Sequence, residues 1–148
     1  MQDVKVNEIC KKFDSVLDKM PELRRKFHEE VKDLLKEELD KNITSSINDE
    51  NGKIKNFQEA VVGSGGGYAA VHAKKGKTGK DSPGAITNYL ENGHRIRMPS
   101  GTNKYYKPRI EIVYVDGFHF YEKTRSNIEA KVLNLAEDFA NEILKSLE

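Results

Sequence analysis

The sequence predicts an α+β fold in which two N-terminal helices and a long C-terminal helix support a small antiparallel sheet and a short helix. Apolar residues recur at intervals of three and four over residues 5–47 and 118–147, as in helices that bury one face. Between these stretches the chain is rich in glycine and in β-branched and aromatic residues, which favours short strands and turns. With 148 residues, the chain is expected to form a single domain over residues 1–148.

The N-terminal periodicity predicts two consecutive helices, residues 5–20 and residues 21–47. The second has the clearest apolar face, formed around Leu34, Leu35 and Leu39, with charged residues on its other faces. Pro21 cannot donate a backbone hydrogen bond but suits the first position of a helix, so we place the boundary there.

Three segments predict the strands of one antiparallel sheet, at about residues 54–62, 68–73 and 109–116. The glycine-rich stretch at residues 63–67 cannot continue a strand, and it is expected to join the first two as a hairpin. The third is a β-branched and aromatic run that ends at Asp116-Gly117.

Two further helices are predicted after the hairpin. Ser82 can cap a helix over residues 83–92, and glycine at position 93 favours its end. Glu91 is therefore expected to have a structural role at the end of a helix rather than a catalytic one. The C-terminal helix is predicted over residues 118–147, although a capping box at Ser126 offers a later start.

No motif in the sequence supports catalysis, so we expect no enzymatic activity, no cofactor and no metal. Gly76-Lys77-Thr78 resembles the end of a phosphate-binding loop, but Val71 occupies the position of the glycine that this motif needs. Cys10 is the single cysteine, and no two of the four histidines are four residues apart. No apolar run approaches the roughly 20 residues of a membrane span, so we expect no membrane partner.

Positive charge is concentrated in the centre of the chain: residues 51–125 carry a net charge of +7, whereas residues 1–50 and 126–148 each carry −3. Two basic loops there supply the candidate contact residues. These cations and tyrosines are Lys74, Lys75, Lys77, Lys80, Arg95, Arg97, Lys104, Tyr105, Tyr106, Lys107 and Arg109. Three interpretations stay open: contacts to nucleic acid, contacts to protein, or a solvated loop.

The order of these parts resembles the small neck proteins of tailed bacteriophages, in the tail-completion or head–tail joining family, which also occurs in prophages and phage-tail-like particles. The similarity lies in residues 89–93 (Tyr-x-Glu-x-Gly), in the basic, proline-containing loop after them, and in the aromatic turn at residues 117–123.

The resemblance implies a non-enzymatic structural subunit that forms a ring, expected to be hexameric, at the top of the tail. Its implied partners are further copies of itself, neighbouring neck and tail-tube or tail-terminator proteins, and DNA passing through the channel. It implies a place in the virion neck after assembly in the cytoplasm of the bacterial host. The alternative function is a nucleic-acid-binding accessory protein that acts through the basic central loops.

Overall fold

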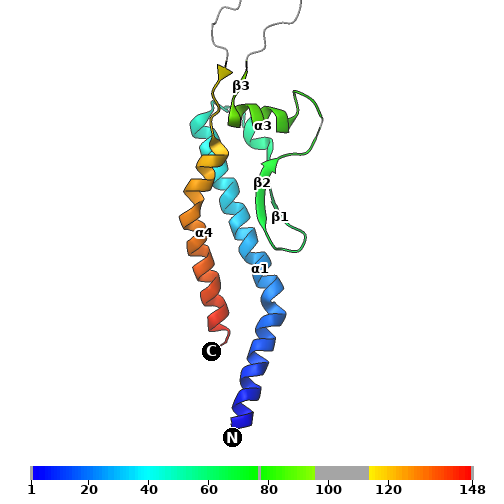
Figure 1. The fold of residues 1–148 in the computed structure, drawn as a ribbon, viewed down its shortest axis with the longest axis vertical. Helices are drawn as coiled ribbons and strands as arrows, with labels where there is room; N and C mark the ends of the chain where they lie inside the picture. The colour runs from blue at the N-terminus through cyan, green and yellow to red at the C-terminus, as the bar shows by residue number, and fades with distance from the viewer. Residues whose placement is uncertain (1, 77, 96–113, 148) are drawn as a thin grey trace, which may run out of the picture.

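A computed structural model of the chain describes residues 2–76, 78–95 and 114–147 (Figure 1). Its elements follow the order α1 (Gln2–Ser46), α2 (Lys53–Asn56), β1 (Gln58–Val62), β2 (Ala69–Ala73), α3 (Pro83–Asn92), β3 (His94–Arg95), β4 (Tyr114–Val115) and α4 (Phe120–Lys145). The long helices α1 and α4 lie side by side and antiparallel, while the β1–β2 hairpin lies along α1 with α3 above it (Figure 1). The expected α+β class is confirmed in outline: the described part of the chain is helix-rich, with small two-stranded antiparallel sheets and a long C-terminal helix.

The predicted helix boundary at Pro21 is wrong, because α1 is one helix of 45 residues with Pro21 inside it. A proline at this position removes the hydrogen bond to the carbonyl of Leu17, four residues earlier. Pro21 and Leu17 are both exposed, so water can reach the carbonyl that has lost its partner. The helix therefore tolerates this proline.

The predicted hairpin is confirmed, with Gln58 opposite Ala73 and Val62 opposite Ala69. The first strand begins later than expected, since Lys53–Asn56 forms the helical turn α2. The reason is a local cap: the carboxylate of Asp49 accepts hydrogen bonds from the backbone nitrogens of Ile54 and Lys55, each at 3.1 Å. The second strand is β2, one residue shorter than predicted.

The predicted three-stranded sheet is wrong for the part of the chain that the structure describes. Residues 109–113 of the third strand lie outside the described residues, and Tyr114–Val115 pairs with His94–Arg95 to form a separate two-stranded ladder. The cause is the turn at Gly93, whose φ of 77° sends the chain back beside Val115. The fourth strand therefore pairs next to the end of α3 rather than on the hairpin.

The short helix is confirmed over residues 83–92, where Ser82 Oγ accepts a hydrogen bond from the backbone nitrogen of Ala85 at 3.2 Å. Helix α4 begins at Phe120, two residues after the predicted start, and ends at Lys145. The alternative start at Ser126 is wrong, because that residue lies within the helix.

The core lies where the C-terminal end of α1 meets the N-terminal end of α4. Leu39, Ile43 and Phe120 have no exposed surface, and partly buried residues from the hairpin and α3 pack against them. A buried polar contact joins the same two helices, since Asn42 Nδ2 donates to Thr124 Oγ1 at 2.9 Å. The packed core is therefore at one end of the long helical pair.

Candidate functional site

The end of α3 caps the start of α4. His119, the N-cap residue of α4, has a φ of 53° and makes no capping hydrogen bond with its side chain. Glu91 supplies the cap instead: its carboxylate accepts hydrogen bonds from the backbone nitrogen of Tyr121, at 3.0 and 3.2 Å, and from that of Glu122, at 3.3 Å. A negative charge is favourable at a helix N-terminus. The structural role predicted for Glu91 at a helix end is confirmed.

Backbone contacts hold the same two segments together. The nitrogens of Phe118 and His119 donate to the carbonyls of Leu90 and Glu91, at 2.7 and 3.2 Å. Gly117 is required by this approach, because a Cβ atom there would lie 2.0 Å from the carbonyl oxygen of Glu91. We call residues 89–95 and 114–122 the α3–α4 junction. It brings together two of the three segments on which the resemblance rests, residues 89–93 and most of residues 117–123.

The ladder β3–β4 belongs to this junction. Arg95 pairs with Tyr114, and the Tyr114 hydroxyl donates to the carbonyl of Asn92 at 2.6 Å. A Cβ atom at Gly93 would lie 2.3 Å from the carbonyl oxygen of Val115, so this position also needs glycine. The ladder therefore places Arg95 and Tyr114, which flank residues 96–113 in the sequence, next to each other.

A chain of hydrogen bonds links the junction to the hairpin. The hydroxyl of Tyr121 donates to Gln58 Oε1, and Gln58 Nε2 donates to Thr87 Oγ1 at 3.0 Å and to the carbonyl of Ile54 at 3.2 Å. Burial, together with the nearby charge of Glu91, raises the pKa of Tyr121 to about 12, so its hydroxyl stays protonated. Sequence patterns did not identify Gln58 or Tyr121, because nothing local marks a polar residue whose partner is 63 positions away.

An open groove lies beside the junction, and we call it the basic groove. It is lined by Lys80, Asp81, Asn88, Tyr89, Gly93, His94 and Arg95. The rings of Tyr89 and His94 lie 5.5 Å apart between centroids, and Tyr89 is partly exposed. Two cations next to an exposed aromatic ring suit an anionic or planar partner, such as a carboxylate-bearing protein surface or a nucleic-acid strand.

The structure describes four of the candidate contact residues, and all four are exposed. Lys80 and Arg95, distant in sequence, are brought together in the basic groove. Lys74 and Lys75 directly follow β2 and do not line this groove. The remaining candidates lie outside the described residues: Lys77, Arg97, Lys104, Tyr105, Tyr106, Lys107 and Arg109.

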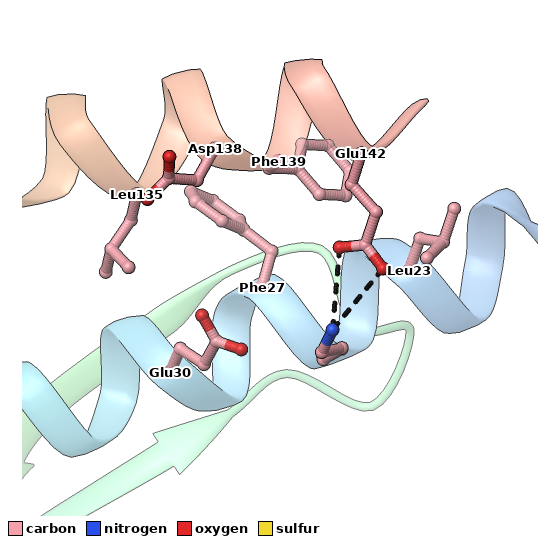
Figure 2. Close-up of a pocket in the computed structure, with 8 residues that line it drawn as sticks. Leu23, Phe27, Glu30, Leu135, Asp138, Phe139 and Glu142 are labelled. Carbon is pink, nitrogen blue, oxygen red and sulfur yellow. Dashed lines mark hydrogen bonds and ion pairs between the residues drawn. The ribbon is translucent and has the colours of Figure 1, made fainter. Parts of the chain in front are cut away.

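A second hollow lies between residues 23–30 of α1 and residues 135–142 of α4 (Figure 2). Its volume is about 220 Å³, and the rings of Phe27 and Phe139 meet inside it with centroids 5.2 Å apart. An exposed ion pair between Lys26 and Glu142, at 3.4 Å, crosses its rim. Its described lining contains no histidine, serine, threonine or cysteine, so it offers no Ser–His or Cys–His pair of nucleophile and base. We interpret it as a packing gap between the helices.

Within residues 2–76, 78–95 and 114–147, no group of three or more histidine, cysteine or acidic side chains is placed to hold a metal ion. None of the described helices is long and apolar enough to cross a membrane. Comparison of the chain with protein-family models, with curated proteins and with solved structures gave no match.

Proposed function

We propose that this chain is a structural subunit of a bacteriophage or prophage neck, a tail-completion or head–tail joining protein. It assembles with further copies of itself into a ring, with six subunits as the working number, at the top of the tail. The ring lies between the portal side and the tail tube or tail terminator, and DNA passes through its centre. The subunit assembles in the cytoplasm of the bacterial host and performs no catalysis, so it needs no cofactor.

The α3–α4 junction is the observation that carries this proposal. The glutamate and glycine of the Tyr-x-Glu-x-Gly segment contact the aromatic turn directly, through Glu91, Gly93 and Gly117. The β3–β4 pair then holds Arg95 and Tyr114, the residues that flank the basic segment 96–113, beside each other on the helical frame. Functional contacts are commonly carried by loops that a rigid scaffold positions. A contact segment anchored in this way suits a subunit whose function is to join its neighbours.

Uncovered apolar surface supports assembly as well. Among the described residues, six hydrophobic side chains are buried, whereas ten large ones are exposed. Exposed apolar side chains occur singly on most proteins, but groups of them mark protein contacts. Exposed apolar side chains that lie close together gain from association.

Electron microscopy of the purified chain, together with thermal melting, tests the proposal. The double variant Lys80→Glu/Arg95→Glu should keep its melting temperature, because both side chains are exposed, but should lose ring formation. The matched control is Arg125→Glu/Lys145→Glu, which makes the same charge change at exposed positions on α4 and should keep both properties. A wild-type chain that forms no ring, alone or when expressed with neck and tail proteins, would contradict the proposal.

A second candidate function, a nucleic-acid-binding accessory protein, is favoured by the ring of Tyr89 beside Lys80 and Arg95 in the basic groove. It predicts that the single subunit binds duplex DNA with an affinity that falls steeply with salt. Replacing both cations should reduce the slope of log affinity against log salt by about two. Absence of DNA binding at low salt would exclude this candidate.

A further inference from the structure

The strand β2 forms one edge of the hairpin, and half of its backbone groups point away from β1. The backbone nitrogen of Gly63 donates to the carbonyl of Tyr68 at 3.0 Å, at the turn end of the two strands. Bonded and non-bonded pairs alternate along an antiparallel ladder, so Ala69 lies in a non-bonded pair, and so do Val71 and Ala73. The N–H and C=O groups of these three residues therefore form a row on the outer edge of β2.

Within the described residues, no other strand pairs with this edge. The nitrogens of Ala69, Val71 and Ala73 have no backbone acceptor there, and the carbonyl of Ala73 meets only the ring of His72, at 3.0 Å. Proteins commonly protect an edge strand with a charged residue, a proline or a bulge. The strand β2 has none of these, since it reads Ala-Ala-Val-His-Ala and keeps an unbroken register with β1.

A groove runs along this edge, and we call it the edge groove. Val71, His72 and Ala73 form one side of it, and α3 forms the other with residues that include Thr87 and Asn88. Its volume is about 400 Å³. Because α3 stands beside the edge, the space suits a single extended segment better than the edge of a second folded hairpin, which its own α3 would flank in the same way.

We propose that the edge groove binds an extended acidic segment of a partner protein, which adds to β2 as a third strand. A row of alternating N–H and C=O groups is matched by another strand, and strand addition is a common mode of peptide recognition. A two-stranded hairpin is also only marginally stable by itself, so a third strand adds stability.

Charge defines one end of the bound segment. Lys74 and Lys75 are exposed directly after β2, and none of the ion pairs in the described part of the chain involves them. A segment that runs antiparallel to β2, the more stable pairing, has its N-terminal end beside these lysines. The acidic residues of the partner therefore lie at the N-terminal end of its added strand.

The first test is hydrogen exchange measured by NMR, with a synthetic peptide in which two glutamates precede alternating valine and threonine residues. In the free chain, the amide protons of Ala69, Val71 and Ala73 should exchange faster than those of Ala70 and His72, which donate to β1. Millimolar peptide should slow exchange at the three edge positions by at least about tenfold and leave the other two unchanged. The same peptide with N-methyl groups on the nitrogens that face β2 should have no effect.

The second test measures peptide affinity by fluorescence anisotropy. Ala69→Pro removes one N–H from the edge at the first residue of β2, where proline is tolerated, and should weaken binding about three- to tenfold. Ala60→Pro is the matched control: it removes an outward N–H from β1, on the other edge of the hairpin, and should bind as the wild type does. Thermal melting checks that both variants remain folded.

The third test exchanges the charges. Lys74→Glu/Lys75→Glu should weaken binding of the acidic peptide at low salt and strengthen binding of a peptide with lysines in place of the glutamates. The control Arg125→Glu/Lys145→Glu makes the same charge change at exposed positions on α4 and should change neither affinity.

Three results would overturn the inference: edge amides that stay fast with peptide, equal affinities for Ala69→Pro and Ala60→Pro, or a charge exchange without effect. Edge amides that are already protected in the free chain, together with a dimer in sedimentation, would show instead that a second copy covers the edge. The inference does not rest on the proposed function, because the edge groove and the basic groove share only Asn88. Lys80→Glu/Arg95→Glu should therefore leave the exchange pattern unchanged.

Discussion

The two ends of α1 have the same apolar rhythm but very different surroundings. At the C-terminal end, Leu39 and Ile43 have no exposed surface, because α4 and the hairpin cover them. At the N-terminal end, Ile9, Phe13 and Leu17 are all more than half exposed. An amphipathic pattern therefore identifies the face of a helix that needs a partner, but it does not say whether the partner is in the same chain.

The polar contacts between α1 and α4 also differ between the two ends of α1. Towards the C-terminal end, Glu38 of α1 accepts hydrogen bonds from Asn127 at 3.0 Å and Lys131 at 2.9 Å, and the pair Asn42–Thr124 is buried nearby. Nearer the N-terminal end, the contacts from Lys26 to Glu142 and from Lys12 to Leu147 are exposed. Since exposed ion pairs contribute little, we expect the stability of the isolated chain to reside mainly at the C-terminal end of α1.

The sharpest test of this comparison is a pair of truncations on one helix. Leu39→Ala should lower the free energy of unfolding by about 2–5 kcal/mol, because it leaves a cavity in the core. Ile9→Ala should change it by no more than about 0.5 kcal/mol at concentrations at which the chain is monomeric. Urea unfolding followed by circular dichroism measures both. Equal losses for the two variants would show that the ends of α1 do not differ as described.

A smaller effect is expected at the α3–α4 junction. Gly117→Ala should cost about 2 kcal/mol, because the added Cβ atom would overlap the carbonyl of Glu91. Gly67→Ala serves as the control: a Cβ atom there meets nothing within 4 Å, and the change should stay within about 0.5 kcal/mol. Thermal melting of the two variants measures this difference. A normal melting temperature for Gly117→Ala would mean that the backbone at the junction can move apart at little cost.

Tyr121→Phe should cost about 1–2 kcal/mol at neutral pH, since the partner Gln58 is 2% exposed and loses a hydrogen bond. The pKa of Tyr121 is raised in the folded chain, to about 12 from an ordinary value of 10.0, so its contribution is complete below pH 10.0 and is lost as the pH rises towards 12. Urea unfolding at a series of alkaline pH values should show a shallower loss for Tyr121→Phe than for the wild type. Parallel curves would argue against a buried hydroxyl.

The smallest effect concerns Glu38. Its hydrogen bonds with Lys131 and Asn127 lower the pKa of the carboxyl below the ordinary 4.5. A lowered pKa in the folded state stabilises the fold above pH 4.5, and this contribution disappears as the pH falls through the folded value. Glu38→Gln should therefore flatten the acid side of a plot of melting temperature against pH. An unchanged acid side would show that Glu38 adds nothing to the α1–α4 contact.

Features of the fold with a local cause could be predicted from the sequence. Ser82, Pro83 and Gly93 mark the ends of α3 because caps and turns depend on neighbouring residues, and the glycine-rich turn marked the hairpin in the same way. The helix boundary predicted at Pro21 is wrong because an exposed proline can remain within a long helix.

The pairing of β4 could not be predicted, since it depends on the close approach of Gly93 and Gly117, which are far apart in sequence. The same limit applies to the candidate site. The sequence identified Lys80 and Arg95 as candidate contact residues, but only the fold places them in one groove with Tyr89.

The cap that Glu91 places on α4 has a consequence for the entropy of the chain. The cap and the pairing of β3 with β4 hold Arg95 beside Tyr114, so the two chain positions that flank residues 96–113 are brought together by contacts outside that segment. Doubling the length of a flexible loop costs only about 0.6 kcal/mol in closure entropy. The fold can therefore carry a longer, shorter or differently charged segment at this place with little loss of stability.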